Sequence, residues 1–218
     1  MKKGLFLAIE GPDGSGKTTT IKTLKEYLEE KGYTVVLTRE PGGTLIGEKI
    51  REILLDSSNG NLSDRAEALL YAAARAQHIE EKIKPNLEKG FIVITDRFYF
   101  SSLAYQGYGR GLGTEKVMDL SVFAINGLHP DKTLFFDITP ETALARKFDQ
   151  GEANRMEEQG ESFHKKTYNG YKKAISLYNS NVITINANGS KERTAKNCIK
   201  AVNKILNSTK KEIQKKEV

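Results

Sequence analysis

The feature that most constrains this chain is a glycine-rich segment near its start, residues 11–18 (GPDGSGKT), which fits the pattern G-x-x-x-x-G-K-[ST]. A short apolar run, residues 5–9, precedes it, and apolar residues recur at helical spacing after it. A strand, a loop and a helix in this order let backbone N–H groups close around phosphates. The segment therefore predicts a phosphate loop that binds a nucleoside triphosphate.

Two side chains at the end of this loop have expected chemical roles. Lys17 supplies a positive charge for the β- and γ-phosphates, and the Thr18 hydroxyl is suited to ligate Mg²⁺. The residues that we expect to bind the nucleotide are Gly11, Asp13, Gly14, Ser15, Gly16, Lys17, Thr18 and Thr19. A glycine-rich turn that matches the pattern by coincidence is the alternative.

Length and composition favour a compact enzyme. The chain has 218 residues, no apolar run of the roughly 20 residues that span a bilayer, and no recognisable signal peptide. Its single cysteine, Cys198, lies in an apolar-periodic stretch and indicates a buried thiol in a reducing cytoplasm. The net charge is +6, of which the lysine-rich end contributes +2, and no basic stripe indicates nucleic acid.

Apolar runs of strand length alternate with helical patterns along the chain. The expected strands are 5–10, 34–38, 91–95, 132–137 and 181–185, and the expected helices are 17–31, 45–55, 63–88, 114–127, 140–148, 161–179 and 190–206. This alternation predicts an α/β fold of the P-loop NTPase type, with a parallel five-stranded sheet and helices on both faces. We expect a single domain over residues 1–208 and a lysine-rich C-terminal tail over 209–218.

Charged residues stand at the ends of two expected strands, where ligands bind in such folds. Asp96 is placed like a carboxylate that holds the water shell of Mg²⁺ opposite Thr18, although it also suits a helix cap. Arg39 and Arg97 form an expected anion clamp, because guanidinium groups match phosphate oxygens. Surface salt bridges are the alternative for either arginine.

The residue types favour a phosphate acceptor. The three histidines, His78, His129 and His164, have no evident nucleophile partner, and we expect each to be a surface or packing residue. A phosphate monoester has a second pKa of about 6 and needs no proton removed at neutral pH. Positioning and charge neutralisation then suffice for phosphoryl transfer.

Three segments together resemble the bacterial thymidylate kinase family. They are IEGPDGSGKTT (residues 9–19), REPGG (39–43) and DRFYFSSLAYQG (96–107), and the likeness extends over residues 4–206. The third segment is the most specific, since many kinases share the first. The resemblance implies transfer of the ATP γ-phosphate to dTMP, giving dTDP and ADP, on a cytoplasmic homodimer in dTTP biosynthesis.

The resemblance also implies roles for individual residues. It assigns catalysis to Lys17, Arg97, Arg155, Arg146 and Asp13, and the metal, through water, to Thr18 and Asp96. It assigns binding of dTMP to Arg39, Arg51, Tyr71, Arg75, Arg97, Ser102, Tyr105 and Gln106. Core packing remains the alternative for Tyr71 and Tyr105, and an exposed salt bridge for Arg75.

Donor chemistry indicates how the base is chosen. Gln106 can donate to thymine O4 and accept from N3–H, but its amide could flip to suit cytosine. Arg75 only donates, so it favours a carbonyl at position 4 over an amino group. The two side chains together favour thymine or uracil.

The polar segment 146–160 is an expected lid. The resemblance implies that Arg146 and Arg155 bring positive charge to the transferred phosphate. Residues 149–152 lack a further basic residue that is common in the family, and Lys147 is a candidate substitute. A charged loop without a catalytic role is the alternative.

Two other functions remain open from the sequence. A deoxynucleoside kinase would need a general base, for which Glu40 is a candidate. Its nucleoside substrate carries no phosphate, however, and would leave the arginines of the acceptor side unpaired. A nucleotide-operated switch would favour an N-K-x-D motif, which the chain lacks.

Overall fold

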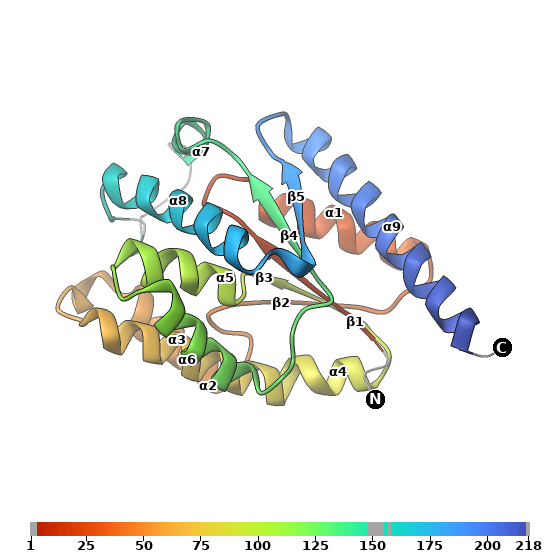
Figure 1. The fold of residues 1–218 in the computed structure, drawn as a ribbon, viewed down its shortest axis with the longest axis horizontal. Helices are drawn as coiled ribbons and strands as arrows, with labels where there is room; N and C mark the ends of the chain where they lie inside the picture. Colours follow the sequence, from red (N-terminus) through yellow and green to blue (C-terminus); the bar gives the residue numbers. More distant parts are fainter. Residues whose placement is uncertain (1–3, 148–154, 157, 217–218) are drawn as a thin grey trace.

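Five parallel strands form the centre of the molecule, in the order β2-β3-β1-β4-β5 (Figure 1). The computed structural model describes residues 4–147, 155–156 and 158–216. The strands are β1 (Leu5–Glu10), β2 (Val35–Arg39), β3 (Ile92–Asp96), β4 (Lys132–Asp137) and β5 (Val182–Asn186). Because β1 is the central strand, the phosphate loop that follows it lies at the middle of the sheet edge. The predicted parallel five-stranded sheet is confirmed.

The described helices follow the predicted order closely. They are α1 (Lys17–Glu30), α2 (Leu45–Leu55), α3 (Asp64–His78), α4 (Lys84–Glu88), α5 (Tyr99–Ser102), α6 (Thr114–Ile125), α7 (Pro140–Lys147), α8 (Glu161–Leu177) and α9 (Lys191–Lys216). Two π-helical segments, η2 (Ile79–Ile83) and η3 (Leu103–Gly109), continue α3 and α5, and short 3₁₀ turns are η1 (Ser57–Asn59) and η4 (Asn179–Asn181).

The sheet separates two hydrophobic cores. On β1, Leu7 and Ile9 point to the face covered by α1 and α9, whereas Phe6 and Ala8 point to the opposite face. That second face is covered by η2, α4, η3, α6 and α8. All four side chains are fully buried, as expected for the central strand of a parallel sheet.

The helical segment over residues 99–109 is the main difference from the predicted pattern. Its sequence, YFSSLAYQGYG, is rich in aromatic residues and glycine, which have low helix propensity. Tertiary packing overrides that propensity, because η3 packs along α8, with Gly170 close to Ala104. Another difference is that α9 continues to Lys216, beyond the predicted end at residue 206.

Among the described residues, no helix combines the length and the apolar character needed to cross a membrane.

We expect Cys198 to be unreactive toward a disulfide reagent in the folded protein at pH 8. The side chain is fully buried, and burial raises the pKa of its thiol to about 12. The thiolate fraction at pH 8 is then on the order of 10⁻⁴. Absorbance of the released reagent should show reaction only after unfolding in urea. Rapid release from the native protein would contradict the burial of this thiol.

Candidate functional site

The phosphate loop joins β1 to α1 and places its lysine inside the loop. Lys17 is buried, and its Nζ donates hydrogen bonds to the carbonyl oxygens of Gly11 at 2.9 Å and Pro12 at 2.7 Å. Gly14 adopts a φ of 77°, and a Cβ at this position would collide with the carbonyl oxygen of Ala143 in α7. The loop therefore requires a glycine at this position, for its conformation and for its contact with α7.

The electrostatic environment of Lys17 is unusual for a lysine. Burial, together with the positive charge of Arg97, lowers its pKa to about 8, against the opposing effect of Asp96, Asp13 and Glu10. A bound polyanion strongly raises the pKa of a buried ammonium group of this kind and so favours its charged form.

Asp96 and Thr18 lie on neighbouring elements beside this loop. Asp96 ends β3, and Thr18 is an exposed residue in the first turn of α1. Oδ1 of Asp96 is buried and has no hydrogen-bond partner among the described residues. A carboxylate oxygen left without a donor fits a water shell around Mg²⁺. The described residues hold no cluster of three His, Cys, Asp or Glu side chains, and Mg²⁺ in nucleotide sites needs none.

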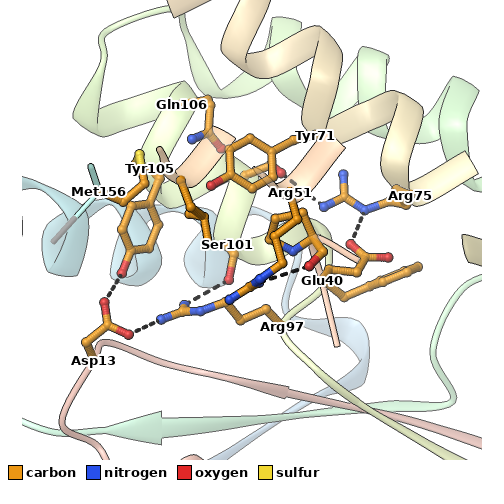
Figure 2. A pocket seen from close by; sticks show the side chains of 14 residues that line it. Asp13, Glu40, Arg51, Tyr71, Arg75, Arg97, Ser101, Tyr105, Gln106 and Met156 are labelled. Carbon is orange, nitrogen blue, oxygen red and sulfur yellow. Dashed lines mark hydrogen bonds and ion pairs between the residues drawn. The ribbon is translucent and has the colours of Figure 1, made fainter. Parts of the chain in front are cut away.

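Arg97 connects the phosphate loop to the pocket beside it (Figure 2). Its backbone is left-handed, with φ 70°, and its Nη2 donates to Oδ1 of Asp13 at 2.6 Å. Its Nη1 donates to Ser101 Oγ at 3.1 Å and to Tyr171 OH at 2.9 Å. The guanidinium group also lies over the ring of Tyr105, whose hydroxyl donates to Asp13. Arg97 is thus held at the junction of the phosphate loop and the neighbouring pocket.

A buried carboxylate that the sequence analysis did not single out holds this junction. Glu10, the last residue of β1, accepts hydrogen bonds from the backbone N–H groups of Phe98 and Ser101 and from the hydroxyls of Ser101 and Tyr171. Burial raises the pKa of Glu10. The available signal was a charged residue at the end of an otherwise apolar run.

A cavity of about 140 Å³ opens beside Arg97. The residues predicted to bind dTMP that line it are Arg51, Tyr71, Arg75, Arg97, Ser102, Tyr105 and Gln106, and Asp13 of the phosphate loop lines it as well. They come from the loop after β1, from α2 and α3, and from the helical segment that follows β3. Glu40 and Met156 also line the cavity. The sequence analysis considered Glu40 only as a general base for a nucleoside kinase, and it did not single out Met156.

Arg75 lies in a buried ion pair on the wall of the cavity. Its Nε donates to Oε2 of Glu40 at 2.8 Å, and its Nη2 donates to Ser102 Oγ at 3.0 Å. Oε1 of Glu40 lies 3.1 Å from Nδ1 of His78, which is fully buried. The exposed salt bridge considered for Arg75 is therefore wrong, and His78 is a packing residue, as expected.

Arg39 and Arg51 are placed differently. Arg51 lines the cavity and donates to the carbonyl oxygen of Pro41 at 2.9 Å, and burial lowers its pKa. Arg39 is half exposed, is paired with Glu48 at 2.7 Å, and does not line the cavity. The structure thus brings Arg51 to the pocket and leaves Arg39 at its periphery.

The two arginines of the expected lid lie on opposite sides of the site. Arg146 donates to the carbonyl oxygens of Ala187 at 3.0 Å and Gly189 at 2.7 Å, and reaches that of Gly14 at 3.5 Å. Arg155 is buried, and it donates to the carbonyl oxygen of Leu54 and pairs with Glu67, both at 2.7 Å.

Part of the expected lid, namely residues 148–154 and 157 and the side chain of Lys147, lies outside the described residues.

Together these features define a phosphate-loop protein of the α/β class, with a second, arginine-lined pocket next to the loop. The model of the family described as thymidylate kinase matches residues 9–198. The chain belongs to the thymidylate kinase family.

Similar proteins bear this out over nearly the whole chain. A thymidylate kinase of Finegoldia magna is 50% identical over 198 residues, which cover 91% of this chain and 97% of that protein. One of Clostridium novyi is 47% identical, over 86% of this chain and 93% of that protein. One of Halalkalibacterium halodurans is 43% identical, over 94% of this chain and 99% of that protein.

We expect binding of a nucleoside triphosphate to take up protons above pH 8. Because the pKa of Lys17 is about 8, the free protein loses this charge as the pH rises, whereas the bound polyanion favours the protonated form. Affinity should therefore be independent of this group well below pH 8 and fall as the pH rises through 8. Calorimetry in buffers of different ionisation enthalpy measures the uptake.

The Lys17→Met variant is the control for this experiment, because it cannot take up the proton. Equal uptake by both proteins would assign the proton to another group.

Proposed function

We propose that this protein transfers the γ-phosphate of ATP to the 5′-phosphate of dTMP, with Mg²⁺, giving ADP and dTDP. The observation that supports this most directly is the arginine-lined cavity next to the phosphate loop, joined to it by Arg97 and Asp13. Relatives named thymidylate kinase match this chain over nearly its full length.

The cavity offers groups for each part of dTMP. Arg51 and Arg97 are suited to the acceptor phosphate, and Arg39 would join them by leaving Glu48. Tyr71 on α3 provides an aromatic face for the base, and Arg75 and Gln106 provide polar contacts at its edge.

On the donor side, the proposed roles follow from charge. The backbone N–H groups of residues 11–19 would surround the ATP phosphates, and Lys17 would neutralise the β- and γ-phosphates. Thr18 and Asp96 would hold Mg²⁺, Asp96 through water, and the ion would neutralise charge on the phosphates. No general base is needed, so direct in-line transfer requires only positioning and charge.

The position of Glu40 favours a nucleotide over a nucleoside as acceptor. Both of its oxygens are occupied, by Arg75 and by His78, and the residue is buried. A general base for a 5′-hydroxyl would need a free oxygen facing the substrate.

We further propose that two copies of the chain associate through α3 and α6, which pack against each other. Large apolar side chains are exposed there: Leu69 is 58%, Val122 48% and Phe123 86% accessible. Such a cluster is typical of an interface. The buried, unpaired thiol of Cys198 supports a location in the cytoplasm.

A coupled assay of ADP release across nucleoside monophosphates tests the proposed reaction. We expect dTMP to be the best acceptor and thymidine to be inactive. Lys17→Ala should lower turnover by on the order of 10²-fold or more while dTMP still binds, because Lys17 serves the donor phosphates. Preferential use of thymidine would refute the proposal, and loss of dTMP binding in the folded variant would refute the role of Lys17.

The lid residues Arg146 and Arg155 remain proposed catalytic residues, but they differ in how far each side chain would have to move to reach the transferred phosphate. Arg146 already lies beside the loop, whereas Arg155 would have to leave Glu67. We expect Arg146→Ala and Arg155→Ala each to lower the single-turnover rate about tenfold or more at saturating ATP and dTMP, since the contacts form mainly in the transition state.

The same single-turnover rates, together with KM for dTMP, distinguish a catalytic role of Arg155 from a role in binding dTMP. If Arg155→Ala keeps the wild-type rate and only raises KM for dTMP, Arg155 belongs to the acceptor pocket, where the structure holds it.

A further inference from the structure

We propose that Glu67 is a positioning residue that selects the base, because it fixes the orientation of the Gln106 amide. The inference rests on the proposed function and adds a residue that does not line the cavity itself. It also answers a question that the sequence left open, namely which end of the Gln106 amide faces the substrate.

The contact between the two residues is short and buried. Nε2 of Gln106 donates to Oε1 of Glu67 at 2.8 Å, and Glu67 is fully buried while Gln106 is 1% exposed. A carboxylate at neutral pH can only accept hydrogen bonds, so the amide must turn its nitrogen toward Glu67. A flipped amide would place two acceptor oxygens against each other at a buried contact, which is costly.

The carboxylate is itself held by charged groups. Arg155 Nη2 donates to Oε2 at 2.7 Å, and Arg110 donates to both oxygens, from Nη2 at 3.1 Å and from Nε at 3.3 Å. Arg110 in turn lies over the ring of Phe163, 4.8 Å from its centroid. Glu67 therefore has little freedom to move away from Gln106.

The result is an amide whose oxygen faces the cavity. Figure 2 shows the oxygen of Gln106 on the side of Tyr71 and the nitrogen on the far side. An acceptor at this position rewards a base that carries N3–H, as thymine and uracil do. Cytosine has an unprotonated N3, so two acceptors would meet and its binding would be penalised. This selection would be independent of the proposed contact between Arg75 and position 4 of the base.

The test compares kcat/KM for dTMP and dCMP in the wild type and in Glu67→Gln. The new amide can donate to the Gln106 oxygen and so permit the flip. We expect the ratio of dTMP to dCMP to fall about tenfold or more, the usual discrimination that one buried hydrogen bond provides. Glu81→Gln is the matched control, because it alters an exposed contact of the same type, Gln77 Nε2 to Glu81 at 2.8 Å. Its ratio should equal that of the wild type.

A double-mutant cycle distinguishes positioning from a general structural effect. If Glu67 acts through Gln106, Glu67→Gln should leave the ratio unchanged in a Gln106→Leu background. An unchanged ratio in the single variant, or an equal fall in both backgrounds, overturns the proposal. A wild-type protein that does not phosphorylate dTMP would instead refute the proposed function.

A measurement on the wild type covers the case in which Glu67→Gln does not fold. The side-chain amide protons of Gln106 can be assigned by nuclear magnetic resonance with the Gln106→Leu variant. At least one should exchange slowly with solvent, both with and without dTMP, because it is bonded to a buried carboxylate. Exchange of both protons as fast as in an exposed glutamine overturns the proposal.

Discussion

The site depends on the buried carboxylate of Glu10 at the end of the central strand. Its two oxygens accept four hydrogen bonds, from Phe98, Ser101 and Tyr171, so a charge that would be costly to bury is compensated by donors from two other elements. These bonds attach the turn after β3 and helix α8 to the end of β1. Arg97, the residue before Phe98, is thereby held with a left-handed backbone beside the phosphate loop.

That constraint connects the phosphate loop and the arginine-lined cavity through one set of contacts. Arg97 contacts the loop through Asp13 and reaches α8 through Tyr171, and its ring contact with Tyr105 extends the arrangement into the acceptor cavity. In the proposed reaction, this arrangement would bring the donor and acceptor phosphates close together before either substrate binds, and positioned charge of this kind accelerates phosphoryl transfer.

The sequence predicted the sheet well because its signals are local. The apolar runs gave all five strands to within one residue at each end, and the glycine pattern identified the loop between β1 and α1. The helical segment after Phe98 was not predicted, since its aromatic and glycine residues form a helix only when packed against α8.

The partners of charged residues were harder to predict. The pairs Arg75–Glu40 and Arg155–Glu67 join residues 35 and 88 positions apart, and no spacing rule connects them.

The π-helical segment η3 sets which of its side chains face the two sides of the cavity. Its adjacent residues Tyr105 and Gln106 serve different partners, Asp13 and Glu67, on two sides of the cavity. A π-helical turn has one residue more than the α-helix it interrupts. Loss of a single residue here would rotate everything beyond it by about 100°. The contacts of Tyr105 with Asp13 and of Gln106 with Glu67 therefore both depend on the length of this segment.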